Sequence, residues 1–429
     1  MFQPPKGMRD WVPADAAKLN WMLDTVRAVF EKYAFQPLCT PAVESFELLS
    51  AKGGLGEAVK DEIYYFRDKA DRELGLRFDL TMGLVRFVLN NSGIQKPFKR
   101  WQIGSSWRYD NPQALRYREF IQADIDIIGV PGALADAECL AATVDALRAI
   151  GFKDFKIRIS NRKLTEAVLE SMGVPKQKML DVFRSIDKRG KITDEEIKKE
   201  LKQKGIDAKI IEKIFSFIRM YGGPELLEKI KEKFGAIPGL DELTELFKLT
   251  EQYSINKWLV LDMSLVRGLD YYTGLVYEIS IGDKKISAGG GGRYDNLIKS
   301  LGGPELPATG ISLGISRLFG VAEELGMLKD RPPAKIFVAP VNDDVRSEAL
   351  NIARQLREQG VACDVDLLYR KLPKQLEYAA NLKIPYVAIV GPDELKKKSV
   401  KLRGMVSGKE RLIHIKNKFN LACAFLFCH

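Results

Sequence analysis

The sequence predicts an α/β protein with two domains: a large N-terminal α+β domain built on an antiparallel sheet with flanking helices, and a small, mostly parallel α/β domain. Three observations support this prediction. Strand-like alternation and helical periodicity both occur before residue 330, a mainly helical insertion with a period of about 3.6 residues occupies roughly 160–250, and strands alternate with helices after residue 334. Consecutive prolines in RPPA at 331–334 stop helix and sheet, so we expect a linker between domains at 1–330 and 335–429.

The N-terminal domain is expected to begin with an amphipathic helix at 15–33. A strand-like stretch follows at 35–43, and its prolines suit an edge or interface strand because proline has no N–H to donate. From 75 to 128 the pattern indicates a strand, a helix at 81–91 with Thr81 as its cap, and two strands joined by a polar loop. Strand alternation returns at 257–288, and a helix is expected at about 311–326.

The C-terminal domain is expected to alternate strands and helices, which is typical of a parallel sheet. Its predicted strands are KIFVAPV, VACDVDL and PYVAIVG, and its predicted helices span 343–359 and 372–381. The apolar tail FNLACAFLFCH is consistent either with a last packed strand or with an altered end.

Histidine is scarce in this chain: His414 and His429 are the only two, and both lie near the C-terminus. Ser-His-Asp, Cys-His and His-ligated metal chemistry are therefore excluded from everything encoded before residue 414. The five cysteines are scattered without a C-x-x-C pair, which argues against disulfides and zinc and favours a reduced, cytoplasmic setting. We expect no membrane association, because the chain lacks an apolar run of about 18 residues.

The net charge of +10 is compatible with a polyanionic partner such as nucleic acid. A lysine-rich surface without such a partner explains the charge equally well. Charge alone therefore leaves the partner open.

Polar and apolar side chains alternate in the final strand of the segment at 105–129. Gln122, Asp124 and Asp126 share one face, which is costly unless these groups have partners. An antiparallel hairpin brings Arg108 near this strand, and the guanidinium fork of an arginine suits phosphate. The alternative is an ion-paired surface hairpin.

Further charged residues stand in apolar surroundings towards the end of the domain. Arg267 and Asp270 precede the pair Tyr271-Tyr272, whose side chains point to opposite faces if the segment is a strand; the alternative is a strand end with a structural salt bridge. Four glycines follow in AGGGGRYD at 288–295, where we expect a tight turn. Arg317 lies in a predicted apolar helix, where a lone arginine ordinarily extends to solvent.

Together these segments resemble class II aminoacyl-tRNA synthetases, and specifically the histidyl-tRNA synthetases. RGLDYYTG at 267–274, followed by GGRYD at 291–295, is similar to that family's own signature pair. The hairpin at 105–129 is similar to class II motif 2, and GISLGISRL at 310–318 to motif 3. The first helix and the Pro41 stretch are similar to motif 1, which forms the dimer interface. The resemblance covers nearly the whole chain and includes a C-terminal domain like the family's anticodon-binding module.

The resemblance implies roles for individual residues. Arg108 would hold the α-phosphate and the histidine carboxylate, Arg267 would stabilise charge at the α-phosphate, and Arg317 would pack on the adenine and reach the γ-phosphate. Asp110 and Arg116 would face ATP. The implied histidine-binding residues are Asp79, Leu80 and Thr81 at the amino group with Gln122 assisting, and Asp126, Tyr271 and Tyr272 at the imidazole.

The resemblance also implies the reaction, its cofactors and its partners. L-Histidine and ATP would give histidyl-adenylate and pyrophosphate, and the histidine would then pass to the 3′ end of tRNA(His) by a homodimeric enzyme. The attacking carboxylate is already ionised, so positioning and charge neutralisation suffice. Mg²⁺ would arrive with ATP. Lys396, Lys397, Lys398, Lys401 and Arg403 form a basic run that suits RNA phosphates or is simply a solvated loop.

Three other interpretations compete with this one. An inactive relative, used as a regulatory subunit, typically lacks the anticodon-like domain and has altered site residues, whereas this chain keeps both. A class II synthetase for another amino acid would need neither Asp126 nor the RGLDYY segment. A generic basic RNA-binding protein would explain the charge but not the buried arginines and carboxylates.

Overall fold

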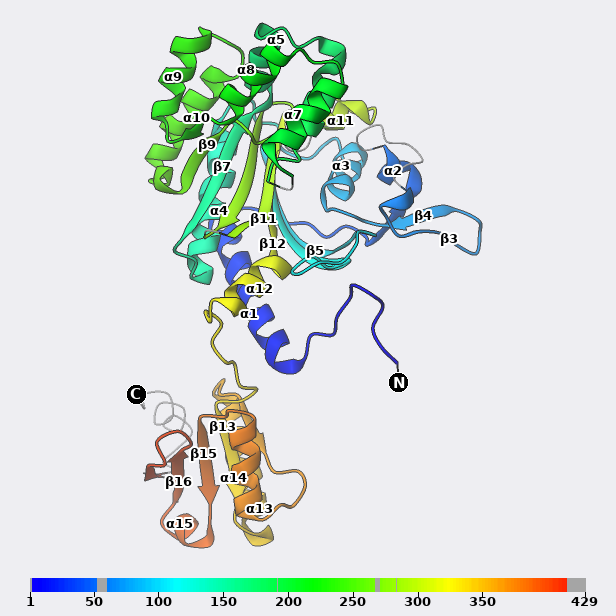
Figure 1. The fold of residues 1–429 in the computed structure, drawn as a ribbon. Coiled ribbons are helices and arrows are strands. Elements are labelled where there is room, and N and C mark those ends of the chain that lie inside the picture. Colours follow the sequence, from blue (N-terminus) through cyan, green and yellow to red (C-terminus); the bar gives the residue numbers. More distant parts are fainter. Residues whose placement is uncertain (1, 52–59, 191, 267–270, 283, 415–429) are drawn as a thin grey trace. The chain divides into compact units, whose positions relative to one another are not determined.

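The computed structural model describes residues 2–51, 60–190, 192–266, 271–282 and 284–414 (Figure 1). The chain divides into two compact units, one made of Met1–Asp10 and Trp21–Met327 and the other of Trp11–Asn20 and Leu328–His429. The first helix, α1 (Pro13–Lys32), therefore has residues in both units, and it matches the helix predicted at 15–33. No helix in the described part of the chain is long and apolar enough to cross a membrane.

A nine-stranded sheet forms the centre of the larger unit, in the order β1-β5-β6-β12-β11-β10-β7-β9-β8. Between β5 and β7 in this order, every pair of adjacent strands is antiparallel. Outside this range, β1 pairs with β5 and β9 pairs with β7 in parallel. The predicted antiparallel sheet is thus confirmed. The strands are β1 (Gln36–Pro37), β5 (Phe98–Trp107), β6 (Glu119–Ile128), β7 (Phe155–Asn161), β8 (Tyr221–Gly222), β9 (Leu259–Asp262), β10 (Leu275–Ile281), β11 (Lys284–Arg293) and β12 (Ala308–Gly314).

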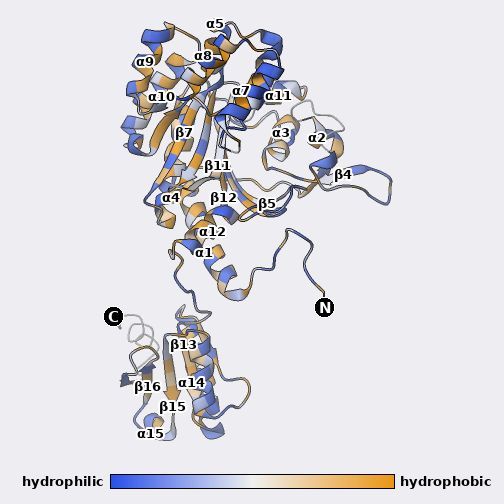
Figure 2. Ribbon diagram, in the orientation of Figure 1, coloured by the Kyte–Doolittle hydropathy of each residue, from blue (hydrophilic) through white to orange (hydrophobic). Residues whose placement is uncertain are grey.

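Helices flank this sheet and form the predicted insertion. The helix α4 (Leu134–Ile150) is buried along most of its length and packs against β6 and β12. The insertion helices are grouped in the green part of Figure 1, and Figure 2 shows hydrophilic and hydrophobic residues mixed along the labelled ones. They are α5 (Arg162–Ser171), α6 (Met179–Ile186), α7 (Asp194–Gln203), α8 (Ala208–Ile218), α9 (Glu225–Phe234) and α10 (Leu240–Gln252).

A three-stranded antiparallel sheet, ordered β2-β4-β3, precedes the helix that carries part of the site. The stretch predicted as a strand at 35–43 contributes only the edge strand β1 and the start of β2, consistent with its prolines. The elements of this region and the remaining helices are β2 (Val43–Ser45), α2 (Phe46–Ser50), β3 (Tyr65–Arg67), β4 (Glu73–Leu76), α3 (Thr81–Asn90), α11 (Leu297–Ser300) and α12 (Ile315–Glu324).

The predicted helix at 311–326 begins too early. The segment GISLG at 310–314 belongs to β12, which lies between β6 and β11, and α12 begins only at Ile315. Gly310 is the partner of Asp126 in the ladder, and a Cβ at 310 would collide with that carboxylate. The strand therefore forms because both neighbours supply backbone hydrogen bonds, which outweigh the apolar helical spacing.

The glycine run at 289–292 lies inside β11 and not at a tight turn, so that expectation is wrong. Side chains on Gly289 and Gly291 would collide with the backbone of β12. These glycines therefore permit the close approach of two strands under the site.

The smaller unit contains a five-stranded sheet in the order β14-β13-β15-β16-β17. The predicted parallel pairing holds for β14, β13 and β15, whereas β15 with β16 and β16 with β17 pair antiparallel, so the sheet is mixed. The tail at 419–429 lies outside the described residues. The elements are β13 (Ile336–Pro340), α13 (Arg346–Glu358), β14 (Cys363–Val365), α14 (Leu372–Asn381), β15 (Tyr386–Val390), α15 (Pro392–Lys396), β16 (Ser399–Gly404) and β17 (Glu410–His414).

Candidate active site

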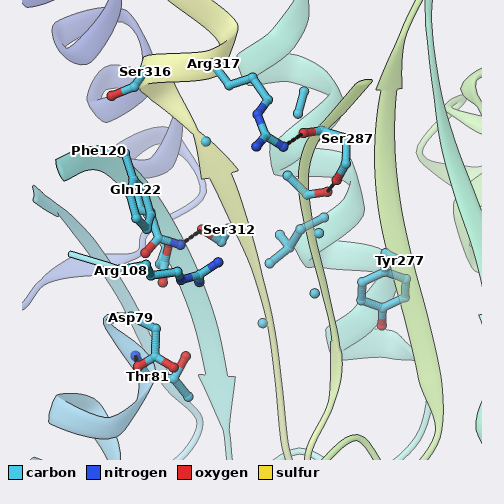
Figure 3. A pocket seen from close by; sticks show the side chains of 18 of the residues that line it. Asp79, Thr81, Arg108, Phe120, Gln122, Tyr277, Ser287, Ser312, Ser316 and Arg317 are labelled. Carbon is cyan, nitrogen blue, oxygen red and sulfur yellow. Dashed lines mark hydrogen bonds between the residues drawn. The ribbon is translucent and has the colours of Figure 1, made fainter. Parts of the chain in front are cut away.

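A cavity of about 530 Å³ in the larger unit brings together segments that are far apart in the sequence (Figure 3). Its walls come from the end of the segment before α3, the loop between β5 and β6, the strands β6, β11 and β12, and the start of α12. The residues predicted from the sequence that line it are Asp79, Thr81, Arg108, Asp110, Arg116, Gln122, Asp126, Tyr271, Tyr272 and Arg317.

Asp79 is positioned by the start of α3. Its Oδ1 accepts hydrogen bonds from the backbone N–H groups of Thr81 and Met82, both at 3.0 Å, and the residue is 6% exposed. Asp79 thus does the capping predicted for Thr81; the N-cap position is Leu80, which makes no side-chain cap bond. The negative charge is stabilised at a helix N-terminus and still faces the cavity.

Leu80 does not line the cavity. Its side chain is fully buried, and its carbonyl oxygen accepts a hydrogen bond from Arg100 Nη2 at 3.4 Å. Arg267 and Asp270 lie outside the described residues, so their predicted roles stay predictions.

Two arginines from different elements line the cavity. Arg108 follows β5; its Nε donates to the carbonyl oxygen of Phe78 at 3.2 Å, and its guanidinium lies 5.1 Å from the centre of the Phe120 ring. Arg317, in the first turn of α12, donates to the carbonyl oxygens of Leu115 and Ser287 (Figure 3). Arg317 therefore points into the cavity and not to solvent, and two fixed positive charges face the same space.

The loop between β5 and β6 carries a third arginine. Arg116 Nη2 lies 2.5 Å from Asp110 Oδ2, and both side chains are partly exposed. An exposed pair of this kind contributes little to stability, about 1 kcal/mol or less. Either partner is therefore available to exchange this contact for a ligand.

Asp126 lies at the closed end of the site and is 4% exposed. Arg100 Nη2 is 2.7 Å from its Oδ2, and the Tyr294 hydroxyl donates to its Oδ1 at 2.5 Å. Burial and the Asp126 charge raise the pKa of Tyr294 well above its ordinary value, so its hydroxyl stays protonated as a donor. The ring of Tyr271 packs 6.5 Å from that of Tyr294.

Tyr271 and Tyr272 both line the cavity, with ring centroids 4.3 Å apart. They precede β10 and are not part of a strand, so the expected division into opposite faces does not apply. Two aromatic rings therefore form one wall beside Asp126.

Several cavity residues were not assigned from the sequence. Asp124 lies on β6 between Gln122 and Asp126, and Ser312 on β12 is its partner in the ladder. The sequence contains a sign of this role for Asp124, because the alternation of polar and apolar residues puts Asp124 on the polar face of the strand. Tyr294 stands in the quoted GGRYD segment, but only the fold brings its hydroxyl to Asp126.

Among the described residues, no group of three or more His, Cys, Asp or Glu side chains is arranged to hold a metal ion. In the smaller unit, the basic run is partly neutralised. Lys401 lies 3.6 Å from both Glu394 and Glu410, and Arg403 lies 3.5 Å from Glu410. Lys397 and Lys398 make no ion pair with any residue that the structure describes.

Comparisons with known proteins point to one family. A family model described as histidyl-tRNA synthetase matches residues 7–318, and one described as an anticodon binding domain matches residues 335–421. The chain is 39% identical to a histidine–tRNA ligase of Thermococcus kodakarensis over 420 residues, which are 95% of each chain. It is 40% identical to that of Aeropyrum pernix over 402 residues, 91% of each. A crystal structure of histidyl-tRNA synthetase from a species of Nostoc superposes with a TM-score of 0.88 at 28% identity and covers 99% of each chain.

Proposed function

Because this chain belongs to the histidyl-tRNA synthetase family, we propose that the cavity of the larger unit is its active site and binds L-histidine and ATP through the residues named above. The activity is that of a histidine–tRNA ligase, which forms histidyl-adenylate and then transfers histidine to tRNA. The observation that carries the proposal is the meeting of two arginines, a row of acceptors and an aromatic wall in one cavity.

The first step needs neutralisation of the carboxylate and phosphate charges more than it needs proton transfer. The histidine carboxylate attacks the α-phosphorus of ATP, a new C–O–P bond forms, and pyrophosphate leaves with the bonding electron pair. Arg108 is proposed to hold both the carboxylate and the α-phosphate, and Arg317 to pack on the adenine and reach the γ-phosphate. Arg267 is proposed, from the family signature alone, to neutralise the charge that develops at the α-phosphate.

The partly exposed pair Arg116–Asp110 is proposed to open towards ATP. Mg²⁺ bound to ATP needs only one or two protein carboxylates and otherwise keeps its water, so the metal is proposed to arrive with the nucleotide.

Histidine is proposed to lie along β6. Asp79 and Thr81, at the start of α3, and Gln122 face the amino group, and Asp126 with the tyrosine wall faces the imidazole. A pocket that pairs with both imidazole nitrogens leaves its own groups unpaired with a wrong amino acid, which supplies discrimination on the order of 10⁴ to 10⁵.

The smaller unit is proposed to bind the anticodon, as its family match suggests, with the domain boundary in RPPA at 331–334. Lys397 and Lys398 are the unpaired cations of its basic run in the described chain. A homodimer and a cytoplasmic location complete the proposal; they rest on the family resemblance and on the scattered cysteines.

Pyrophosphate exchange tests the proposal directly. Purified protein is given ATP, Mg²⁺ and each of the twenty amino acids, and Arg108→Ala serves as the site variant. Exchange with histidine alone, lost in Arg108→Ala, supports the site. Exchange that persists unchanged in a folded Arg108→Ala protein removes the cavity from the reaction, and no exchange from the folded wild type favours a regulatory relative.

A further inference from the structure

The carboxyl group of Asp124 lines the cavity and has no role so far. Asp124 lies between Gln122 and Asp126 on the same face of β6 and is 4% exposed. Its Oδ1 is buried and has no hydrogen-bond partner among the described residues. A buried acceptor without a partner is costly, so its retention beside a substrate site points to a ligand.

A serine connects Asp124 to its neighbour. Gln122 Nε2 donates to Ser312 Oγ at 2.7 Å, as Figure 3 shows, and Ser312 is the ladder partner of Asp124 and lowers the pKa of its carboxyl. Because the serine oxygen accepts from the amide, its single proton is free for the carboxylate. The bond to Ser312 fixes the Gln122 amide with its nitrogen towards the serine, and its Oε1 is left buried without a partner in the described structure.

Two unpaired acceptors, on adjacent residues of one strand face, need a ligand with several donors. A primary ammonium has three donors and a positive charge, whereas an imidazole offers at most two in a plane. Asp79, whose Oδ1 is held by backbone N–H groups, lines the same cavity and adds negative charge.

We propose that Asp124 is a further binding residue for the substrate: it accepts a hydrogen bond from the α-ammonium of histidine beside Gln122 Oε1, and Ser312 positions both acceptors. This inference rests on the proposed histidine site and deepens it. It makes Asp124 a specificity residue for the amino group and Ser312 a positioning residue.

The charges around Asp124 support this assignment. Burial raises the pKa of Asp124 to about 7; Arg100 and the Ser312 bond oppose this, and Asp126 and Asp79 add to it. Near neutral pH the carboxyl is therefore partly protonated in the free enzyme, and an arriving ammonium favours its ionised form, with release of a proton. The charged or titratable groups around it are Arg77, Asp79, Arg100, Arg108, Asp126 and Tyr294.

Two histidine analogues separate the ammonium from the rest of the substrate. L-Histidinol keeps the ammonium and the imidazole, whereas 3-(imidazol-4-yl)propanoate keeps the imidazole and the carboxylate but has no ammonium. Calorimetry at pH 7.5 measures the Kd of each for wild type, Asp124→Asn and Ser312→Ala. Ser160→Ala is the matched control, because Ser160 is a fully buried serine of the same sheet, on β7, and does not line the cavity.

Asp124→Asn is expected to weaken histidinol about tenfold or more and to change the propanoate less than about twofold, since a hydrogen bond to a charged group is lost from only one ligand. Ser312→Ala is expected to weaken histidinol about threefold. The binding enthalpy of histidinol in two buffers of different ionisation enthalpy gives the number of protons released. Wild type should release more protons than Asp124→Asn, and Ser160→Ala should release as many as wild type.

Three outcomes overturn the inference. Equal losses for both analogues indicate a structural role, a loss for the propanoate alone places Asp124 at the imidazole, and no loss for either shows that the ligand does not reach it. A wild-type protein that binds neither histidine nor histidinol contradicts the proposed function itself, which is a separate failure.

Discussion

Two groups of buried polar side chains lie in the same nine-stranded sheet and differ in how completely they are paired. In the paired cluster (Asp136, Tyr277, Arg293 and Thr309), Asp136 accepts from the Thr309 hydroxyl at 2.8 Å, from Arg293 Nε at 3.1 Å and from the Tyr277 hydroxyl. In the cavity cluster (Gln122, Asp124 and Ser312), one oxygen of each of the first two has no partner in the described chain.

Pairing separates these two clusters, although both are buried in one sheet. Both clusters contain a buried carboxylate, so burial and residue type do not distinguish them. What distinguishes them is the hydrogen-bonding capacity left over after folding. Asp136 is paired within its own cluster, whereas Gln122 and Asp124 each keep one acceptor that a ligand in the cavity can complete.

The largest expected effect is on stability, in the paired cluster. Arg293→Met leaves the fully buried Asp136 without its cation, so we expect the free energy of unfolding to fall by about 3–5 kcal/mol. Urea unfolding followed by circular dichroism measures it. A loss below about 1 kcal/mol would show that the cluster is not structural.

The next effect is on catalysis. Arg108 is exposed, and its side chain donates one hydrogen bond, to the carbonyl oxygen of Phe78, so Arg108→Ala should leave the melting temperature nearly unchanged. We expect kcat/KM in pyrophosphate exchange to fall by about 10² to 10³, because a preorganised cation is lost at the reacting phosphate. Lys99→Ala, which removes a cation paired to Glu138 outside the cavity, is the control.

The third effect links the cavity cluster to pH. The folded-state pKa of Asp124 is about 7, above its ordinary value of 3.8, so its contribution to stability is fully present below about pH 4 and is lost as the pH rises through 7. Asparagine does not titrate. Asp124→Asn should therefore gain about 2 kcal/mol relative to wild type between pH 5 and pH 8 in urea unfolding. A pH-independent difference would contradict the assigned pKa.

The smallest effect concerns the other unit. Replacing both Lys397 and Lys398 by alanine should weaken tRNA binding about threefold and reduce its salt dependence, because two unpaired cations are lost. Filter binding at several salt concentrations measures both. Replacing Lys401, which already lies near two glutamates, should change less, and the reverse order would show that pairing does not predict the RNA contact.

The sequence predicts the larger features because they rest on local patterns. The helical insertion, the hairpin and the alternating C-terminal domain follow from periodicity, and the polar face of β6 follows from the period of a strand. The motif residues were found by family resemblance, and the cavity gathers most of them.

The predictions that the structure corrects failed because they depend on contacts between distant segments. The apolar spacing of GISLG predicts a helix, and only its pairing with β6 and β11 makes it a strand. The glycine run predicts a turn, and only the close approach of β12 explains it as part of a strand. Thr81 is the natural cap by residue type, but the carboxylate of Asp79 accepts from the N–H groups of Thr81 and Met82 at the start of the helix. The unpaired oxygen of Asp124 is invisible in the sequence, because pairing is a property of the assembled sheet.

One pair of variants tests the central claim most directly. Gln122→Ala removes a member of the cavity cluster, and Thr309→Val removes a hydroxyl from the paired cluster at nearly constant volume. For both, we would measure the melting temperature without ligand and the Kd of histidine by calorimetry at a temperature where both are folded. The account predicts that Gln122→Ala weakens histidine about tenfold with an unchanged melting temperature, and that Thr309→Val lowers the melting temperature with an unchanged Kd. If the melting temperature and the Kd of histidine change together in both variants, the unpaired oxygens of Gln122 and Asp124 do not mark the ligand site.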